Sequence, residues 1–314
     1  MPTTRWDSGP CGPSLRRVRR TLAVLLAAGA AAAGVAVAAV PGGDDPGTQT
    51  TTAPGRATAP TSSSLPDPRA ALPKDPARLA ETLADTTRRL RTAVERWDIS
   101  APVPRDVTYL ALHHQRILRL MSERRRLGDA TLRRLPRDVR GEARDTVVAR
   151  RALAAIPRDR SRIPRVRVAA AAPLADLRAA YRAAQRRFRV NWSVLAAVNL
   201  VESAFGRVRS ASEAGARGPM QFLPSTWRVY GMGGDIDDPR DAILAAANLL
   251  AANGGRRDID RALYAYNHST HYVRAVRRLA GRMRRDERAL RTYYAWQVYV
   301  LTKHGTRRVT GPGR

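Results

Sequence analysis

The most constraining feature of the sequence is a nearly continuous apolar run at residues 194–201, which has the composition of a buried helix. Asn191 and Ser193 stand before it, where residues that cap a helix N-terminus are expected. A helix that is apolar on all sides lies at the centre of its domain, with other elements packed around it. The run ends at Glu202, so the sequence predicts a carboxyl group at the end of a central helix.

Glu202 is the candidate catalytic residue. Three effects are expected to raise its pKa: partial desolvation, the apolar neighbours Val201 and Phe205, and the negative end of the helix dipole. A raised pKa keeps the carboxyl protonated, which is the state that a general acid needs. A lone glutamate at a helix end is nevertheless more often a surface residue, so the residues downstream decide between the two interpretations.

Glycine, amide and aromatic residues follow Glu202. Gly218 is expected to permit close approach of the backbone to a ligand, because it has no side chain. Gln221 supplies an amide that can bind sugar hydroxyls or an acetamido group, and Tyr266 and Asn267 place a ring beside a second amide. These groups suit a site that cleaves carbohydrate.

These residues occur in four short strings whose order resembles the soluble-lytic-transglycosylase-like (SLT) family of peptidoglycan-cleaving enzymes. That family shares a lysozyme-like fold with goose-type lysozymes. Each string alone is weak, whereas four in order at compatible spacing are a strong signal. The resemblance extends from Asn191, or slightly earlier, to about Arg277. Its strings are Glu202-Ser203, Gly218-Pro219-Met220-Gln221, the helix entry after Asp238-Pro239, and Ala265-Tyr266-Asn267.

The resemblance implies a role for each matching residue. Glu202 corresponds to the family's catalytic glutamate, and no cofactor is expected. Pro219 stands where many members have leucine or alanine, which removes a backbone donor and leaves the side-chain chemistry untouched. The residues implied to line a glycan groove around Glu202 are Ser203, Met220, Gln221, Tyr266 and Asn267, with Tyr272 as a further candidate.

A mechanism with one carboxylate fits the sequence better than a mechanism with two. Inverting hydrolysis needs a second carboxylate about 6.5–9.5 Å from the first, and retaining hydrolysis needs one at about 5–5.5 Å. The candidates Glu213, Asp235 and Asp237 lie in loop-like surroundings, and none is a compelling partner. The resemblance implies that Glu202 protonates the oxygen between N-acetylmuramic acid and N-acetylglucosamine, and then acts as base while a 1,6-anhydro ring closes. Two alternatives stay open: a goose-type muramidase that hydrolyses the same bond, and a catalytically silent wall-binding protein of the cell envelope.

The N-terminal segments predict export. Residues 1–20 form a basic cytoplasmic flank, and residues 21–40 carry no charge over a length that can span a bilayer. Ala36-Val37-Ala38 would also fit a signal-peptide cleavage site, although an uncleaved anchor is slightly favoured. Both interpretations place the remainder outside the cytoplasm, either anchored in the membrane or secreted to the cell wall. Residues 41–76 are rich in Pro, Thr and Ser and predict a disordered linker.

The rest of the chain predicts a mainly α fold with a lysozyme-like catalytic domain. Residues 77–172 have helical spacing of leucines and are interpreted as a helical spacer, interrupted at Pro102, Pro104 and Pro136. Residues 173–280 are the predicted catalytic domain, and residues 281–314 a C-terminal helical extension.

The formal net charge of +29 limits the classes of partner. So basic a chain suits nucleic acid, an anionic membrane surface or an anionic wall polymer. Nucleic acid is not expected, because the sequence has no zinc-finger spacing, no basic region leading into heptads and no ribonucleoprotein string. Peptidoglycan strands are the expected partner, and the charge would also suit anionic wall polymers.

No metal site is expected. Adjacent His113 and His114 point to different sides of a helix, so they do not share a metal. Asp235, Asp237 and Asp238 lack the glycine and the final glutamate of a calcium loop at the required spacing, and Asp238 is interpreted as a helix cap.

Overall fold

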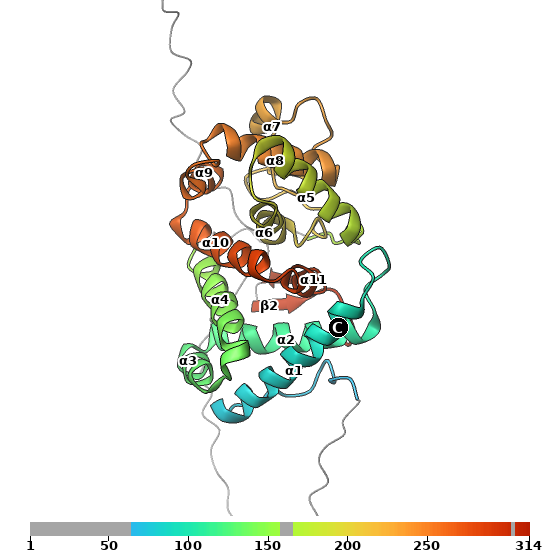
Figure 1. Cartoon of the computed structure of the whole chain (residues 1–314), viewed down its shortest axis with the longest axis vertical. Coiled ribbons are helices and arrows are strands. Elements are labelled where there is room, and N and C mark those ends of the chain that lie inside the picture. Colours follow the sequence, from blue (N-terminus) through green and yellow to red (C-terminus); the bar gives the residue numbers. More distant parts are fainter. Residues whose placement is uncertain (1–63, 158–165, 303–304) are drawn as a thin grey trace, which may run out of the picture.

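The computed structural model describes residues 64–157, 166–302 and 305–314, and it is mainly helical, as predicted. Figure 1 shows α1–α4 at one end of the molecule, α5–α9 at the other, and α10 and α11 between them. The elements are α1 (Pro76–Arg96), α2 (Arg105–Glu123), α3 (Arg125–Arg134), α4 (Arg137–Ala154), α5 (Leu174–Phe188), α6 (Trp192–Ser203), α7 (Pro224–Tyr230), α8 (Pro239–Ala252), α9 (Ile259–Tyr266), α10 (Thr270–Arg285), α11 (Arg288–Tyr294), β1 (Tyr299–Thr302) and β2 (Gly305–Arg308).

The predicted basic flank 1–20 and apolar segment 21–40 lie outside the described residues. Within the part of the chain that the structure describes, no helix has both the length and the apolar character needed to span a bilayer.

The end of the predicted disordered linker is held against the helices. Of the linker 41–76, the structure describes residues from Ser64 onward, which form coil up to α1. Leu72 packs on the hydrophobic core. The carbonyl of Ser64 accepts a hydrogen bond from Arg89 at 2.7 Å, and the carbonyl of Ala70 accepts one from Arg116 at 2.6 Å. The prediction of disorder is therefore wrong for these residues, because arginines of α1 and α2 satisfy their carbonyls.

Local signals fix several helix starts. The Asp75 carboxylate accepts hydrogen bonds from two backbone N–H groups in the first turn of α1, and the Asp238 carboxylate accepts one from the Asp241 N–H in the first turn of α8. Proline precedes α2 and α4, at Pro104 and Pro136. The starts at Pro104, Pro136 and Asp238 agree with the sequence prediction.

The predicted spacer packs against the predicted catalytic domain. Apolar residues of α1–α4 and of α5–α11 belong to one continuous hydrophobic core. α4 lies along α10, and α1 contacts α11. Residues 77–172 therefore do not hold the remainder at a distance, and the domain boundary at residue 173 stays a prediction.

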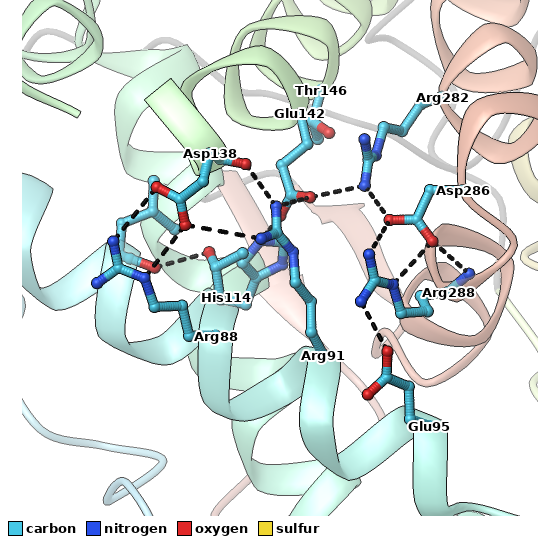
Figure 2. A network of polar contacts seen from close by, with 12 residues as sticks. Arg88, Arg91, Glu95, His114, Asp138, Glu142, Thr146, Arg282, Asp286 and Arg288 are labelled. Atoms are coloured by element: carbon cyan, nitrogen blue, oxygen red, sulfur yellow. Dashed lines mark hydrogen bonds and ion pairs between the residues drawn. The ribbon is translucent and has the colours of Figure 1, made fainter. Parts of the chain in front are cut away.

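Ion pairs reinforce this junction, as Figure 2 shows. Glu142 of α4 lies 2.9 Å from Arg91 of α1 and 2.8 Å from Arg282 of α10. Arg288 of α11 reaches Glu95 of α1 at 2.7 Å. The Glu142 side chain is 12 % exposed and that of Arg282 15 %, so this pair is largely removed from water.

The prediction of a helical extension over residues 281–314 is wrong for its last part, which forms two strands. The last helix ends at Tyr294, and β1 and β2 then form an antiparallel hairpin in which Tyr299 pairs with Arg308. Val298 and Val300 pack with Val208 in a small apolar cluster of their own. β-Branched residues beside such a cluster favour a strand over a helix.

α6 is the central helix of its part of the molecule. Every residue from Trp192 to Ser203 is buried, and α5, α8, α10 and α11 contact it. Asn191 caps its N-terminus through a hydrogen bond from the backbone of Ser193. The prediction of a buried central helix with Glu202 near its C-terminal end is confirmed.

Candidate active site

Glu202 lies in the last turn of α6 and is 1 % exposed. Its Oε1 accepts a hydrogen bond from the Tyr272 hydroxyl of α10 at 2.8 Å. Oε2 has no hydrogen-bond partner among the described residues. Burial raises the pKa of Glu202 to about 8, and the hydrogen bond from Tyr272 opposes that rise by favouring the charged form. Desolvation is thus nearly complete, where the sequence predicted a partial effect.

The backbone turns sharply directly after this carboxyl. Ala204, Phe205 and Gly206 all have positive φ, at 50°, 63° and 79°. Left-handed conformations cost energy in residues other than glycine, so other contacts must hold the turn in place. One of these is the Gly206 N–H, which donates to the Ser203 hydroxyl at 2.7 Å.

Residues 217–222 form a tight loop beside the end of α6. Arg217 and Phe222 close it by exchanging two backbone hydrogen bonds of 2.8 and 2.9 Å. Gly218 has φ +74°, and a Cβ at this position would lie 1.9 Å from the carbonyl oxygen of Ile236. Gly218 therefore allows close approach of another backbone segment, where the sequence analysis expected a ligand.

A buried polar cluster attaches this loop to α6. The Pro219 carbonyl accepts hydrogen bonds from Asn199 Nδ2 at 2.8 Å and from the Ser203 hydroxyl. The Tyr181 hydroxyl of α5 donates to Asn199 Oδ1 at 2.6 Å and so fixes the orientation of the amide. Ser203 is fully buried, and its hydroxyl is used in these contacts. In this structure its role is therefore to attach the loop to α6.

Tyr181 and Asn199 are positioning residues that the sequence analysis did not single out. Asn199 carried a usable signal, because it is the polar residue inside the apolar run 194–201 and a buried amide needs partners. Tyr181 carried none, since nothing in the sequence links α5 to this amide.

Two tyrosines lie beside this loop and Glu202. The rings of Tyr266, at the end of α9, and Tyr272, in the first turns of α10, are stacked with centroids 6.3 Å apart and planes at 6°. The Tyr266 hydroxyl donates to the Met220 carbonyl at 2.6 Å. Since Tyr272 binds Glu202, one chain of contacts runs from the loop through both rings to the carboxyl.

The remaining predicted groove residues are buried in the loop and directly after α9. Gln221 is buried with φ 50°, and its Nε2 donates to the Gly218 carbonyl at 3.1 Å. Its Oε1 has no hydrogen-bond partner among the described residues. Met220 is fully buried, and Asn267 is buried directly after α9. Tyr272 thus contacts the Glu202 carboxyl directly. Tyr266 and Met220 are connected to the carboxyl only through Tyr272.

The other carboxylates considered from the sequence are exposed. Glu213, Asp235 and Asp237 all lie on the surface. Asp237 pairs with Arg217 at 2.6 Å, while Asp235 accepts a backbone hydrogen bond from Asp237. Within the described parts of the chain, burial and Tyr272 are the influences on the pKa of Glu202, and no carboxylate adds to them.

Metal-binding residues do not gather in the described ranges, where no group of three or more His, Cys, Asp or Glu could hold an ion. Burial lowers the pKa of His113 to about 4 and that of His114 to about 3, so both rings are neutral at pH 7.

Comparison with known proteins agrees with the helical site described above. Residues 179–288 match a family model described as the transglycosylase SLT domain. No curated protein and no solved structure matches the chain. The matched residues run from α5 to the start of α11 and contain Glu202 together with all six predicted groove residues. At the level of the family, this domain supports a lytic-transglycosylase-type function on peptidoglycan, which implies a location outside the cytoplasm. The chain therefore carries, at residues 179–288, a transglycosylase SLT domain of the lysozyme-like superfamily.

Proposed function

We propose that the protein is a peptidoglycan lytic transglycosylase that cleaves the β-1,4 bond between N-acetylmuramic acid and N-acetylglucosamine and leaves a 1,6-anhydromuramoyl end. Glu202 acts first as acid and then as base. The observation that carries the proposal is the state of this carboxyl, which is buried, has a pKa of about 8 and keeps one oxygen unpartnered within the described structure.

Proton donation is the first step. With a pKa of about 8, Glu202 is mostly protonated at neutral pH. Tyr272 donates to Oε1, so Oε1 acts as the acceptor and the acidic proton belongs on Oε2. Transfer of this proton to the bridging oxygen lets the bond to the muramoyl C1 break, and the N-acetylglucosamine side leaves as an alcohol.

Ring closure is the second step. Glu202 is now a carboxylate, which the hydrogen bond from Tyr272 stabilises. The substrate's acetamido group stabilises the positive charge at C1. The carboxylate takes the proton of the muramoyl 6-hydroxyl while O6 bonds to C1, and this returns Glu202 to its acid form without consuming water.

The surroundings of Glu202 support ring closure over hydrolysis. Hydrolysis with two carboxylates needs the second within about 10 Å and poised for the reaction. Glu213 is instead exposed, and Asp237 is engaged with Arg217.

Digestion of purified peptidoglycan by the full chain, with mass analysis of the sugar ends, tests the proposal. We expect 1,6-anhydromuramoyl ends, and their release should be lost in Glu202→Gln but kept in Glu213→Gln, a matched change at an exposed carboxylate. Reducing muramic ends would establish a hydrolase in place of a transglycosylase. Unchanged release by Glu202→Gln would remove Glu202 from the chemistry.

A further inference from the structure

A hollow lies on the face formed by α9 and α10, and no predicted groove residue lines it. Its volume is about 520 Å³, within the range of pockets that bind small ligands. Arg261 and Tyr264 of α9 form one wall, and Val273, Arg274 and Arg277 of α10 contribute to the other.

The hollow is lined by four arginines and two aspartates, so its net charge is positive. The guanidinium groups of Arg261 and Arg274 have no ion pair and no hydrogen-bond acceptor among the described residues. The two acids that line the hollow are already engaged: Asp258 caps the N-terminus of α9, and Asp260 lies 3.0 Å from Arg277. Two arginines thus remain available to an anion, which a guanidinium can bind through paired hydrogen bonds.

Tyr264 gives the hollow an apolar surface. It is 45 % exposed and is the one exposed Phe, Trp or Tyr ring in the part of the chain that the structure describes. His268 packs edge-on against it with ring centroids 5.6 Å apart, which restricts its orientation. An exposed ring can stack on the apolar face of a sugar, with its hydroxyl left for solvent or ligand.

We propose that this hollow is a second carbohydrate-binding site for a chain that carries carboxylate or phosphate groups. Tyr264 stacks on a sugar or polyol unit, and Arg261 and Arg274 bind the anionic group beside it. The assignment of that chain to the cell wall rests on the proposed function, whereas the chemistry of the hollow does not.

The position of the hollow gives such binding a consequence for cleavage. α9 and α10 also carry Tyr266 and Tyr272, the two rings that connect the loop with Glu202. A wall fragment held at the outer face of these helices stays close to the site, which raises the local concentration of glycan strands.

Retention on purified insoluble cell wall tests the proposal. The full chain is used with the Glu202→Gln change as background, so that the wall stays intact during the measurement. Arg261→Gln/Arg274→Gln is compared with Arg125→Gln/Arg126→Gln, a pair of exposed arginines on α3 that removes the same charge. Tyr264→Ala tests the ring separately. Thermal melting confirms that each variant is folded.

The expected result is a loss of binding of about tenfold for Arg261→Gln/Arg274→Gln and severalfold for Tyr264→Ala, with a change under about twofold for the α3 pair. Equal losses in the two arginine pairs would overturn the proposal, because binding would then follow net charge and not the hollow. Full retention by both Arg261→Gln/Arg274→Gln and Tyr264→Ala would overturn it as well.

The source of the anion is identified with two wall preparations, one that keeps its phosphodiester-linked polymer and one from which acid has extracted it. If Arg261→Gln/Arg274→Gln binds less only to the first preparation, the anion is the phosphate of the polymer. If it binds less to both, the anion is a carboxylate of the peptidoglycan itself. Cleavage is not measured here, so failure of the proposed function and failure of this site are separate outcomes.

Discussion

The Tyr272 hydroxyl donates a 2.8 Å hydrogen bond to Glu202 Oε1, although the two residues are 70 positions apart in the chain. This contact joins the end of the central helix α6 to the start of α10. It serves both forms of the carboxyl, because Oε1 accepts the bond whether or not Oε2 carries a proton. The hydrogen bond stabilises the charged form more, so Tyr272 limits how far burial raises the pKa of Glu202.

The first prediction concerns the pH dependence of cleavage. Since the free enzyme needs a protonated Glu202, kcat/KM should fall as pH rises through about 8. Tyr272→Phe removes a donor to the carboxylate, so the fall should move to higher pH. The plateau should drop about 10–100-fold, because the carboxylate formed in the first step loses a charge-assisted hydrogen bond.

Tyr266→Phe is the control for this prediction. Its hydroxyl binds the Met220 carbonyl and not Glu202, so the pH at which activity falls should stay where it is. Muropeptide release measured from pH 5 to 10 separates the two variants. An unmoved profile in Tyr272→Phe would contradict the role given to this hydrogen bond.

The second prediction is that Glu202→Gln has a higher free energy of unfolding than the wild type at neutral pH but not at acidic pH. Below the ordinary pKa of 4.5 the carboxyl is protonated in both the folded and the unfolded state. Between 4.5 and about 8 the unfolded chain releases this proton while the folded protein keeps it, so the wild type loses stability. The glutamine variant has no such loss and should gain up to about 3 kcal/mol in unfolding free energy near pH 7.

Urea unfolding at pH 4 and pH 7 measures this difference. The advantage of Glu202→Gln should be absent at pH 4 and present at pH 7. Glu213→Gln, at an exposed position, should match the wild type at both. An equal advantage at the two pH values would show that ionisation of Glu202 is not its source.

Much of the fold follows from signals that act over a few residues, which is why the sequence could predict it. Asp75 and Asp238 cap their helices through backbone groups two or three positions away, and Pro104 fixes its own φ. Glu202 could be found for a similar reason, since the apolar run before it already requires a buried helix.

The parts that the sequence did not predict depend on contacts between distant segments. Nothing near Gly218 indicates that the Ile236 carbonyl will lie against it, and nothing near Asn199 indicates the Tyr181 hydroxyl. Residues 77–172 show helical spacing whether they pack on another domain or stand apart. Only the partner that covers the apolar stripe of α4, here α10, distinguishes the two cases.

The third prediction separates two glycines that share a left-handed conformation. Gly215 and Gly218 have φ +79° and +74°, so alanine is strained at both, by about 1 kcal/mol. A Cβ meets nothing within 4 Å at Gly215, whereas at Gly218 it lies 1.9 Å from the Ile236 carbonyl oxygen. Gly218→Ala should therefore cost about 3 kcal/mol or more.

The unfolding free energy of Gly215→Ala measures the backbone strain alone, and that of Gly218→Ala measures strain and clash together. The difference between the two variants gives the cost of the clash. Gly218→Ala should also lower muropeptide release at temperatures where it is still folded, because the displaced loop carries Gln221. Similar values for the two alanines would contradict the close packing of residues 218 and 236.

The last prediction compares two glutamates that each bind two arginines. Glu142 lies 2.9 Å from Arg91 and 2.8 Å from Arg282, and its side chain is 12 % exposed. Glu287 contacts Arg178 and Arg182 and is 45 % exposed.

Glu142→Gln should cost about 2–3 kcal/mol of unfolding free energy, because it removes the carboxylate shared by two largely buried guanidinium groups. Arg282 keeps Asp286 and Arg91 keeps the more distant Asp138, so the loss is not complete. Glu287→Gln should cost no more than about 1 kcal/mol, since water solvates its arginines. Urea unfolding of both variants at low and high salt measures these costs. Only the cost of Glu287→Gln should become smaller at high salt, because salt screens exposed ion pairs. Equal costs would mean that the junction between α4 and α10 is open to solvent. A large cost at Glu142 alone would show that the helices before residue 173 are part of the stability of the SLT domain.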